Sequence, residues 1–349
     1  MSRIEVDTIL PQSGTTLTLG SSGDTVTIPS GVSLAPGGGL TLTGNFVVDG
    51  GSIKLDGNYP TGSNNVAMGD NALNSVASDG NSNTIIGNNA GTAITTGDLN
   101  TGVGAGALLG TNTASNNTAF GGISLCANTT GACNTAVGAC ALQENTTASY
   151  NTGIGFKSLG VNTTGAENTA VGSCSLAANT TGAKNTAVGR NAGTAITTGT
   201  FNDIFGRAAG FALTTGDYNV AIGSTSLANL TTTDANVAVG HAALNTVVTG
   251  AQNTAVGFCA LYTTTVSCNT GIGYQALKAT TTGHSNTSVG RNSASNNTTG
   301  DSNTAVGFCS LGGNTTGDNN TAIGYNAMYE GTTTGDFNTM VGVSSGRKM

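Results

Sequence analysis

One short pattern returns at a nearly constant interval through most of the chain. Asn134-Thr135-Ala136-Val137-Gly138 is followed 17 residues later by Asn151-Thr152-Gly153-Ile154-Gly155. The asparagine of this Asn-x-x-apolar-Gly pattern stands at positions 65, 83, 100, 117, 134, 151, 168, 185, 202, 219, 236, 253, 269, 286, 303, 320 and 338, which makes 17 copies. A fixed short period of this kind is typical of a solenoid, in which each repeat forms one coil.

The composition alone would suggest a different class of chain. Among 349 residues there are 55 glycines, no tryptophan and only 8% charged residues, which resembles a low-complexity, disordered sequence. A disordered chain has no physical reason to keep a repeat in phase, however. A stack of narrow coils needs only a thin apolar core, so the period favours an ordered solenoid.

Each position of the repeat has its own chemistry. Counting the asparagine as position 1, position 4 is apolar and position 5 is Gly in every copy, position 8 is Ala or Ser, and position 9 is usually Leu. Positions 12 to 15 favour Asn-Thr-Thr-Gly, as in residues 162–165. Because Val and Thr favour strands, we predict an all-β chain, a parallel β-solenoid (β-roll) of about 17 coils with 17-residue repeats and no appreciable helix.

Within one coil we expect a strand at positions 2 to 4 and a second strand near the Thr pair. Side chains at positions 4 and 9 are expected to point inward, and small residues at positions 3 and 8 to permit close packing between subunits. Glycine at position 5 permits a corner with positive φ or a close backbone approach. Asparagines stacked in a column can hydrogen-bond along the rod. The predicted structural ladder in the central repeats comprises Asn134, Asn151, Asn168, Gly138, Gly155 and Gly172.

The first part of the chain lacks the period. Residues 1–58 read as short β segments separated by Gly and Pro, for example Thr16–Leu19 and Asp24–Ile28. We predict a β-rich N-terminal attachment arm over 1–58, a linker over 59–64 and the solenoid over 65–349. Such an arm has too little apolar area to fold alone, so we expect it to need a partner.

Charge and motif content argue against several function classes. A net charge of −7 with no basic run gives no footprint for nucleic acid. No 18-residue apolar run predicts a transmembrane helix, and Met1–Asp7 lacks the pattern of a secretion signal. His241 and His284 are the only two histidines, so neither a metal triad nor a Ser-His-Asp set is supported. We therefore expect no enzyme, no cofactor, no nucleic-acid partner and no membrane insertion.

The cysteines do not form a disulfide framework. There are seven, none in a Cys-x-x-Cys pair. Four of them, Cys140, Cys174, Cys259 and Cys309, occupy position 7 of repeats that are never adjacent, so cross-links between neighbouring coils are not expected. We interpret them as small, half-buried side chains in a protein made in a reducing compartment.

The pattern Asn134-Thr135-Ala136-Val137-Gly138-x-x-Ala141, with its copies, resembles the Asn-Ser-x-apolar-Gly-x-x-Ser/Ala repeat of the YadA-like head of trimeric autotransporter adhesins. The resemblance covers about residues 65–345 and implies a left-handed parallel β-roll and a homotrimer. The repeat of that family is usually shorter, and the extra residues here would lengthen the loop that holds Asn-Thr-Thr-Gly. A secretion signal, a coiled-coil stalk and a membrane barrel, which that family requires, are not expected from this sequence.

The beginning of the chain resembles a different group. The start of the chain is similar to the N-terminal arm of tail-fibre and other virion proteins of marine bacteriophages. The similarity covers about 50 residues and is carried by residues 4–9, 13–20 and 23–31. That resemblance implies a structural fibre of a phage virion, made in the host cytoplasm, docked to other tail proteins through the arm and extracellular after release.

Two columns of the predicted solenoid are candidate sites. Position 6 in six successive late coils carries a mainly aromatic stripe, His241, Phe258, Tyr274, Arg291, Phe308 and Tyr325. This stripe is interpreted either as a packing column or as a glycan-binding surface. Position 16 brings Asp301 and Asp318 together, with Asp336 one residue later in a longer repeat, and these are either solvated turn residues or weak cation ligands.

Three functions remain open from the sequence. The first is a homotrimeric structural fibre of a phage virion that contributes to attachment to a host-surface glycan. The second is a non-viral cell-surface adhesin or extracellular filament protein. The third is an ice-binding solenoid, which is disfavoured because the Thr pair is interrupted at residues 112–113 and 248–249.

Overall fold

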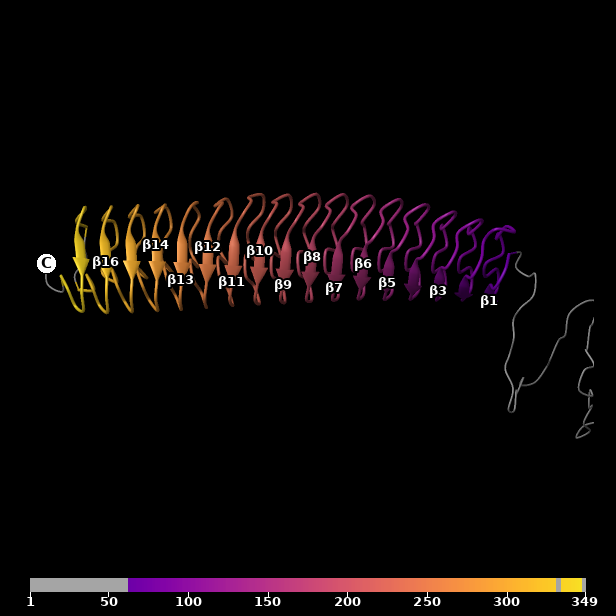
Figure 1. The fold of residues 1–349 in the computed structure, drawn as a ribbon, viewed down its shortest axis with the longest axis horizontal. Helices are drawn as coiled ribbons and strands as arrows, with labels where there is room; N and C mark the ends of the chain where they lie inside the picture. The colour runs from indigo at the N-terminus through magenta and orange to yellow at the C-terminus, as the bar shows by residue number, and fades with distance from the viewer. Residues whose placement is uncertain (1–61, 331–333, 347–349) are drawn as a thin grey trace, which may run out of the picture. The chain divides into compact units, whose positions relative to one another are not determined.

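The computed structural model describes residues 62–330 and 334–346, and shows them as a stack of short parallel β-strands (Figure 1). There are 17 three-residue strands and no helix in these ranges. The strands are β1 (Val66–Met68), β2 (Thr84–Ile86), β3 (Thr101–Val103), β4 (Thr118–Phe120), β5 (Thr135–Val137), β6 (Thr152–Ile154), β7 (Thr169–Val171), β8 (Thr186–Val188), β9 (Asp203–Phe205), β10 (Val220–Ile222), β11 (Val237–Val239), β12 (Thr254–Val256), β13 (Thr270–Ile272), β14 (Thr287–Val289), β15 (Thr304–Val306), β16 (Thr321–Ile323) and β17 (Thr339–Val341). The predicted all-β parallel solenoid is confirmed. The predicted arm over 1–58 lies outside the described residues.

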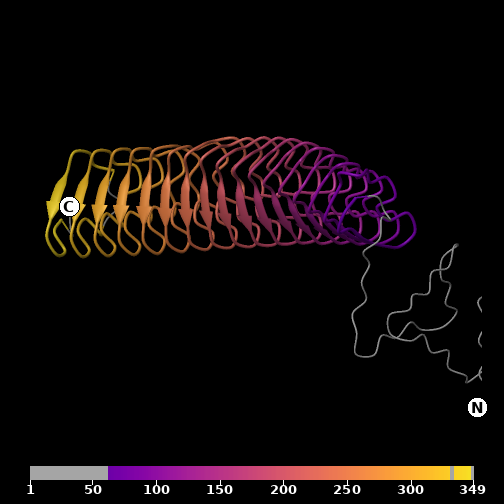
Figure 2. The same cartoon turned by 45° about the vertical axis from the view of Figure 1, so that its right-hand side comes forward.

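Each strand pairs in parallel with the strand of the next coil, so one sheet runs the length of the rod (Figure 2). The register repeats coil by coil, with Thr135 opposite Thr152 and Val137 opposite Ile154. The register is also unchanged where the coil length differs. Thr254 of β12 lies opposite Thr270 of β13, although this coil is one residue shorter than the 17-residue repeat. Insertions and deletions are therefore absorbed in the loop and leave the sheet unchanged.

The core of each coil is formed by positions 3, 8 and 9 of the repeat. In the coil that begins at Asn134, Ala136, Ala141 and Leu142 are fully buried. Leu142 confirms the inward orientation expected for position 9. The small residues at positions 3 and 8 pack inside their own coil, so the prediction that they serve packing between subunits is wrong.

Position 4 points outward, which contradicts the sequence-based prediction. Val137 and Ile154 are 36% and 38% exposed, whereas Ala136 between Thr135 and Val137 is fully buried. Successive residues of a strand face opposite sides. Once the small position 3 faces the narrow core, positions 2 and 4 must both face outward.

One strand forms per coil, and the second strand expected near the Thr pair is absent from the described coils. The Thr pair still joins neighbouring coils. The backbone N–H of Thr146 donates to the carbonyl oxygen of Thr163 at 3.1 Å, and the Thr146 hydroxyl donates to the same oxygen at 3.0 Å. Hydrogen bonding between coils therefore continues on this side without extended strand geometry.

The asparagine column at position 1 is confirmed as a buried ladder. Asn134, Asn151 and Asn168 are fully buried. The Asn134 side-chain amide donates to the carbonyl of Ala148 at 2.9 Å, which closes its own coil. Its Oδ1 accepts the backbone N–H of Asn151 in the next coil at 2.9 Å. A single side chain thus closes one coil and connects it to the next.

Position 5 needs glycine for both of the reasons expected. Gly138, Gly155 and Gly172 have φ angles of 128°, 129° and 130°. A Cβ atom on Gly155 would lie 2.6 Å from the backbone of Gly172. Any other residue at this corner would be strained and would also push neighbouring coils apart.

Position 12 carries a second column, which is large and apolar in three coils that have Gly at position 9 (Ile94, Ile196 and Leu213). It is also apolar in some coils with Leu at position 9, as at Leu230. Where position 9 is Leu, position 12 holds Asn in several coils, and Asn162 donates to Asn145 at 2.8 Å. Where position 9 is Gly193, position 12 is the fully buried Ile196. A Cβ atom on Gly193 would lie 3.0 Å from the Ile196 side chain, so the two positions share one volume.

Candidate functional site

The position-6 stripe forms a continuous stack along the rod. The rings of His241 and Phe258 lie 5.2 Å apart at 10°, and those of Phe258 and Tyr274 lie 5.3 Å apart at 9°. Phe308 and Tyr325 form a further stacked pair at 5.2 Å. The guanidinium of Arg291 joins the two groups, 5.6 Å from the Tyr274 ring and 5.5 Å from the Phe308 ring.

The stack confirms the packing interpretation of this column and restricts the glycan interpretation. Each inner member of the stripe has ring or guanidinium neighbours on both faces. Phe258 and Tyr274 are each 44% exposed, although both ring faces of each have a stacked neighbour. A sugar ring therefore has no free aromatic face on Phe258 to lie against.

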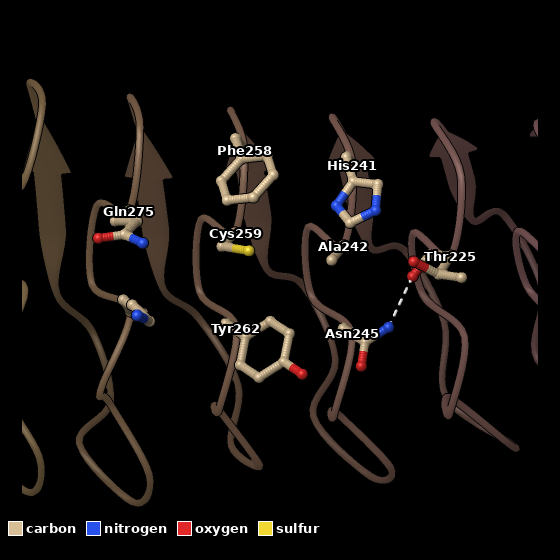
Figure 3. Close-up of a pocket in the computed structure, with 9 residues that line it drawn as sticks. Thr225, His241, Ala242, Asn245, Phe258, Cys259, Tyr262 and Gln275 are labelled. Carbon is tan, nitrogen blue, oxygen red and sulfur yellow. Dashed lines mark hydrogen bonds between the residues drawn. The ribbon is translucent and has the colours of Figure 1, made fainter.

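Beside the stripe lies an open groove of about 450 Å³ that joins neighbouring coils (Figure 3). Its lining comes from three repeat positions. Position 6 supplies His241 and Phe258, position 7 supplies Thr225, Ala242, Cys259 and Gln275, and position 10 supplies Asn245, Tyr262 and Lys278. The other four residues of the stripe, Tyr274, Arg291, Phe308 and Tyr325, do not line it.

Sequence reasoning missed the position-10 wall of this groove. The signal was present in the repeat alignment, where position 10 reads Asn245, Tyr262 and Lys278 in successive coils. Tyr262 forms no stack with another aromatic ring among the described residues, in contrast to Phe258. Its ring is the unstacked aromatic surface of the groove.

The groove lies in a stretch of the chain without acidic residues. No Asp or Glu occurs between Asp234 and Asp301, whereas Lys278 and Arg291 do occur there. Burial raises the pKa of the Cys259 thiol, and the Lys278 ammonium acts in the opposite direction. Lys278 therefore brings a positive charge to the part of the groove that Cys259 lines.

The acidic column at position 16 has a structural role. Asp301 Oδ1 accepts the backbone N–H of His284 at 2.8 Å, and Asp318 Oδ1 accepts that of Asp301 at 2.8 Å. Asp336 does the same for Asp318. In another coil the Ser149 hydroxyl takes this acceptor role, so a carboxylate is not required.

The same column offers little to a cation. His284 Nε2 lies 3.2 Å from Asp301 Oδ2, so this carboxylate already has a partner. The described part of the chain contains no group of three or more His, Cys, Asp or Glu that would suit a metal ion. The weak cation candidates Asp301, Asp318 and Asp336 are best explained as loop acceptors.

The outward side of the sheet is a second candidate surface, here called the strand face and consisting of positions 2 and 4 of every coil. Position 4 is apolar in all 17 strands, and position 2 is Thr or Val in every strand except β9, where it is Asp203. At position 4 the exposed fraction of the residue is 55% for Phe120, 41% for Ile222 and 40% for Ile323. This surface is a long apolar stripe with almost no charge.

All seven cysteines are free thiols. In the ranges that the structure describes, no helix has the length and hydropathy to cross a membrane. Comparisons with protein families, with curated proteins and with solved structures gave no match for this chain.

Proposed function

We propose that this chain is a structural fibre protein of a phage virion whose rods associate side by side as a parallel homotrimer. The strand face is the observation that carries the proposal. Soluble monomers seldom expose a contiguous apolar stripe of this length, and such stripes mark interaction surfaces. A second and third copy of the same chain fit it best, because the repeat of the partner has the same spacing.

The energetics favour association along the whole rod. Burying a Val or Ile side chain fully contributes about 1.5–3 kcal/mol. Residues such as Val137 and Ile154 are already more than half buried, so each would add roughly 0.5–1 kcal/mol. Small contributions summed over 17 coils outweigh the entropic cost of association, estimated at about 4–15 kcal/mol.

Closed symmetry limits the arrangement of the copies. Homo-oligomers usually close with cyclic symmetry. A parallel arrangement keeps each coil at the level of its counterpart, so Thr at position 2 meets the partner's equivalent position. Three copies around one axis would hide the strand faces and leave the corner side chains of position 6 at the periphery.

The role in a virion is supported by the resemblances of the sequence. The arm over 1–58 would dock the rod to other tail proteins, and the rod would extend toward the host and contribute to attachment to a surface glycan. A non-viral adhesin or extracellular filament protein is the alternative, and it would use the same strand face for assembly. An ice-binding role gains no support from the strand face, where Met68, Phe120 and Asp203 interrupt a regular lattice.

Mass photometry of the purified chain tests the assembly. We expect a species of three times the 34.0 kDa chain mass. The double variant Ile154→Asp/Ile272→Asp, which places charges on the strand face, should shift the population to monomers. The matched control is Val248→Asp, because Val248 is 42% exposed but lies outside the strand face. A wild-type monomer, or trimers that tolerate both aspartates, would rule the proposal out.

A further inference from the structure

The groove beside the stripe combines three kinds of chemistry within neighbouring coils. Tyr262 offers an aromatic ring, and Asn245 and Gln275 offer amides (Figure 3). Lys278 also lines the groove and offers a cation. Pockets that bind small organic ligands typically have this composition, with apolar walls and a few polar groups that fix orientation. None of the outward strand positions lines the groove, so association through the strand face does not use these residues.

Tyr262 provides the place where a sugar ring can stack. The opposite wall presents Phe258, whose faces are occupied by His241 and Tyr274. Tyr262 has no stacked ring neighbour among the described residues, and its side chain is half-buried. A pyranose packs its apolar C–H face on such a ring and leaves its hydroxyls directed at the surrounding polar groups.

The amides supply hydrogen-bond groups of both kinds. Asn245 donates its side-chain amide to the carbonyl of Thr225 at 2.8 Å, which fixes the orientation of the side chain and leaves its Oδ1 as an acceptor for a hydroxyl. Gln275 adds both a donor and an acceptor from the next but one coil. These groups match the alternating hydroxyls of a sugar better than a simple inorganic anion.

The charge of the region selects the class of sugar. The chain as a whole carries −7, yet residues 235–300 contain no acidic residue and include Lys278 and Arg291. Positive charge without a neighbouring acidic residue favours anions at this segment. Residues 168–202, with Lys184 and Arg190, share this charge pattern but contribute no side chain to the groove. A neutral glycan would gain nothing from this arrangement.

We propose that the groove formed by His241, Phe258, Tyr262, Gln275 and Lys278 binds an acidic polysaccharide, with Tyr262 stacking on a sugar ring and Lys278 pairing with its carboxylate or sulfate. This deepens the attachment role proposed above, and it assigns that role to the groove instead of the full six-residue stripe.

Calorimetric titration of the full chain tests the ligand class. The probes are a galacturonate hexamer, a neutral glucose hexamer and inorganic polyphosphate. We expect the uronate to bind at least tenfold more tightly than the other two. Equal binding of the neutral hexamer would remove the role of charge, equal binding of polyphosphate would remove the role of the sugar ring, and no binding of the uronate at millimolar concentration would end the proposal.

Variants locate the binding to the groove. Tyr262→Ala and Lys278→Gln should each weaken uronate binding roughly tenfold. One matched control is Tyr329→Ala, which occupies the same repeat position as Tyr262 four coils further along the chain. The other is Lys157→Gln, which removes a cation outside the groove. Controls that weaken binding as much as the groove variants would show that the ligand binds elsewhere.

A thiol footprint separates loss of binding from loss of structure. Cys259 lines the groove, whereas Cys174 occupies the same repeat position outside it. Bound uronate should slow iodoacetamide labelling of Cys259 several-fold and leave labelling of Cys174 unchanged. Mass photometry of the same samples reports assembly independently. A trimer that does not bind uronate would refute the proposed binding site but not the fibre. A monomer that binds uronate would refute the trimeric fibre but not the binding site. Unprotected Cys259 at saturating uronate would contradict the proposed position of the ligand.

Discussion

The backbone N–H of Asn151 donates to Oδ1 of Asn134 at 2.9 Å, while the Asn151 side-chain amide donates to the carbonyl of Gly165, also at 2.9 Å. The first bond connects two coils and the second closes one coil. Because the same pair of bonds recurs in most repeats, for example at Asn134 and Asn168, loss of one such asparagine affects two levels of the rod at once.

Replacing Asn151 should therefore destabilise the rod locally. Asn151→Asp removes the amide donor and buries a carboxylate at a fully buried site, with an expected cost of about 3 kcal/mol or more. Hydrogen exchange resolved by peptide should show faster exchange in the coils on either side. Asn116→Asp, at an exposed position, is the control and should change exchange little. Equal protection in both variants would contradict the role assigned to the ladder.

The corner glycine gives a second prediction. Gly155→Ala should cost about 2–4 kcal/mol, because φ is 129° and the new methyl group would meet the backbone of Gly172. Gly122→Ala is the matched control, since the nearest atom to its Cβ would be 3.9 Å away. It should be neutral or slightly stabilising. Urea unfolding followed by circular dichroism measures both, and similar midpoints for the two variants would argue against the close approach.

The shared volume of positions 9 and 12 predicts a coupling between two substitutions. Gly193→Leu alone should overpack the core by about 1–3 kcal/mol, and Ile196→Asn alone should leave a cavity. The double variant reproduces the combination found in the preceding coil, Leu176 with Asn179. The new side-chain amide at position 196 could then donate to the buried Asn179 Oδ1, which has no hydrogen-bond donor. A double-mutant cycle should show at least about 1 kcal/mol of favourable coupling. Strict additivity would show that the two sites are independent.

The reactivity of Cys259 should depend on Lys278. Burial raises the thiol pKa and the ammonium opposes that effect, so Lys278→Gln should raise the pKa of Cys259 further. Alkylation requires the thiolate. The variant should therefore react more slowly between pH 7.5 and 9, and the difference should vanish at higher pH, where both forms are ionised. Labelling rates by peptide mass spectrometry measure this, and the rate at Cys140 serves as the internal control.

The period made most of the fold predictable. Asn134 and Gly138 recur with a constant spacing, and only stacked coils explain an invariant asparagine and glycine in a chain with so few large apolar residues. The direction of the strand side chains was not predictable in the same way. Ala136 and Val137 are adjacent and both apolar, so alternation alone does not say which one faces the core, and the larger residue was assigned to it incorrectly.

The groove illustrates a different limit of sequence reasoning. The column that contains His241 and Phe258 was predictable because six successive coils carry mainly aromatic side chains at position 6. The opposite wall depends on how far position 10 lies from position 6 across a turn, which is set by backbone geometry at the corner. The three-dimensional course of the coil is therefore needed to place Tyr262 and Lys278 in the candidate site.

The constancy of strand register across coils of 16, 17 and 18 residues has a consequence for how the length of the rod can change. Duplication or loss of one whole repeat changes the length by one strand spacing, about 4.8 Å, and leaves every ladder intact. Reach is thus adjustable by recombination between repeats in steps of one coil, independently of the side chains that any one coil displays.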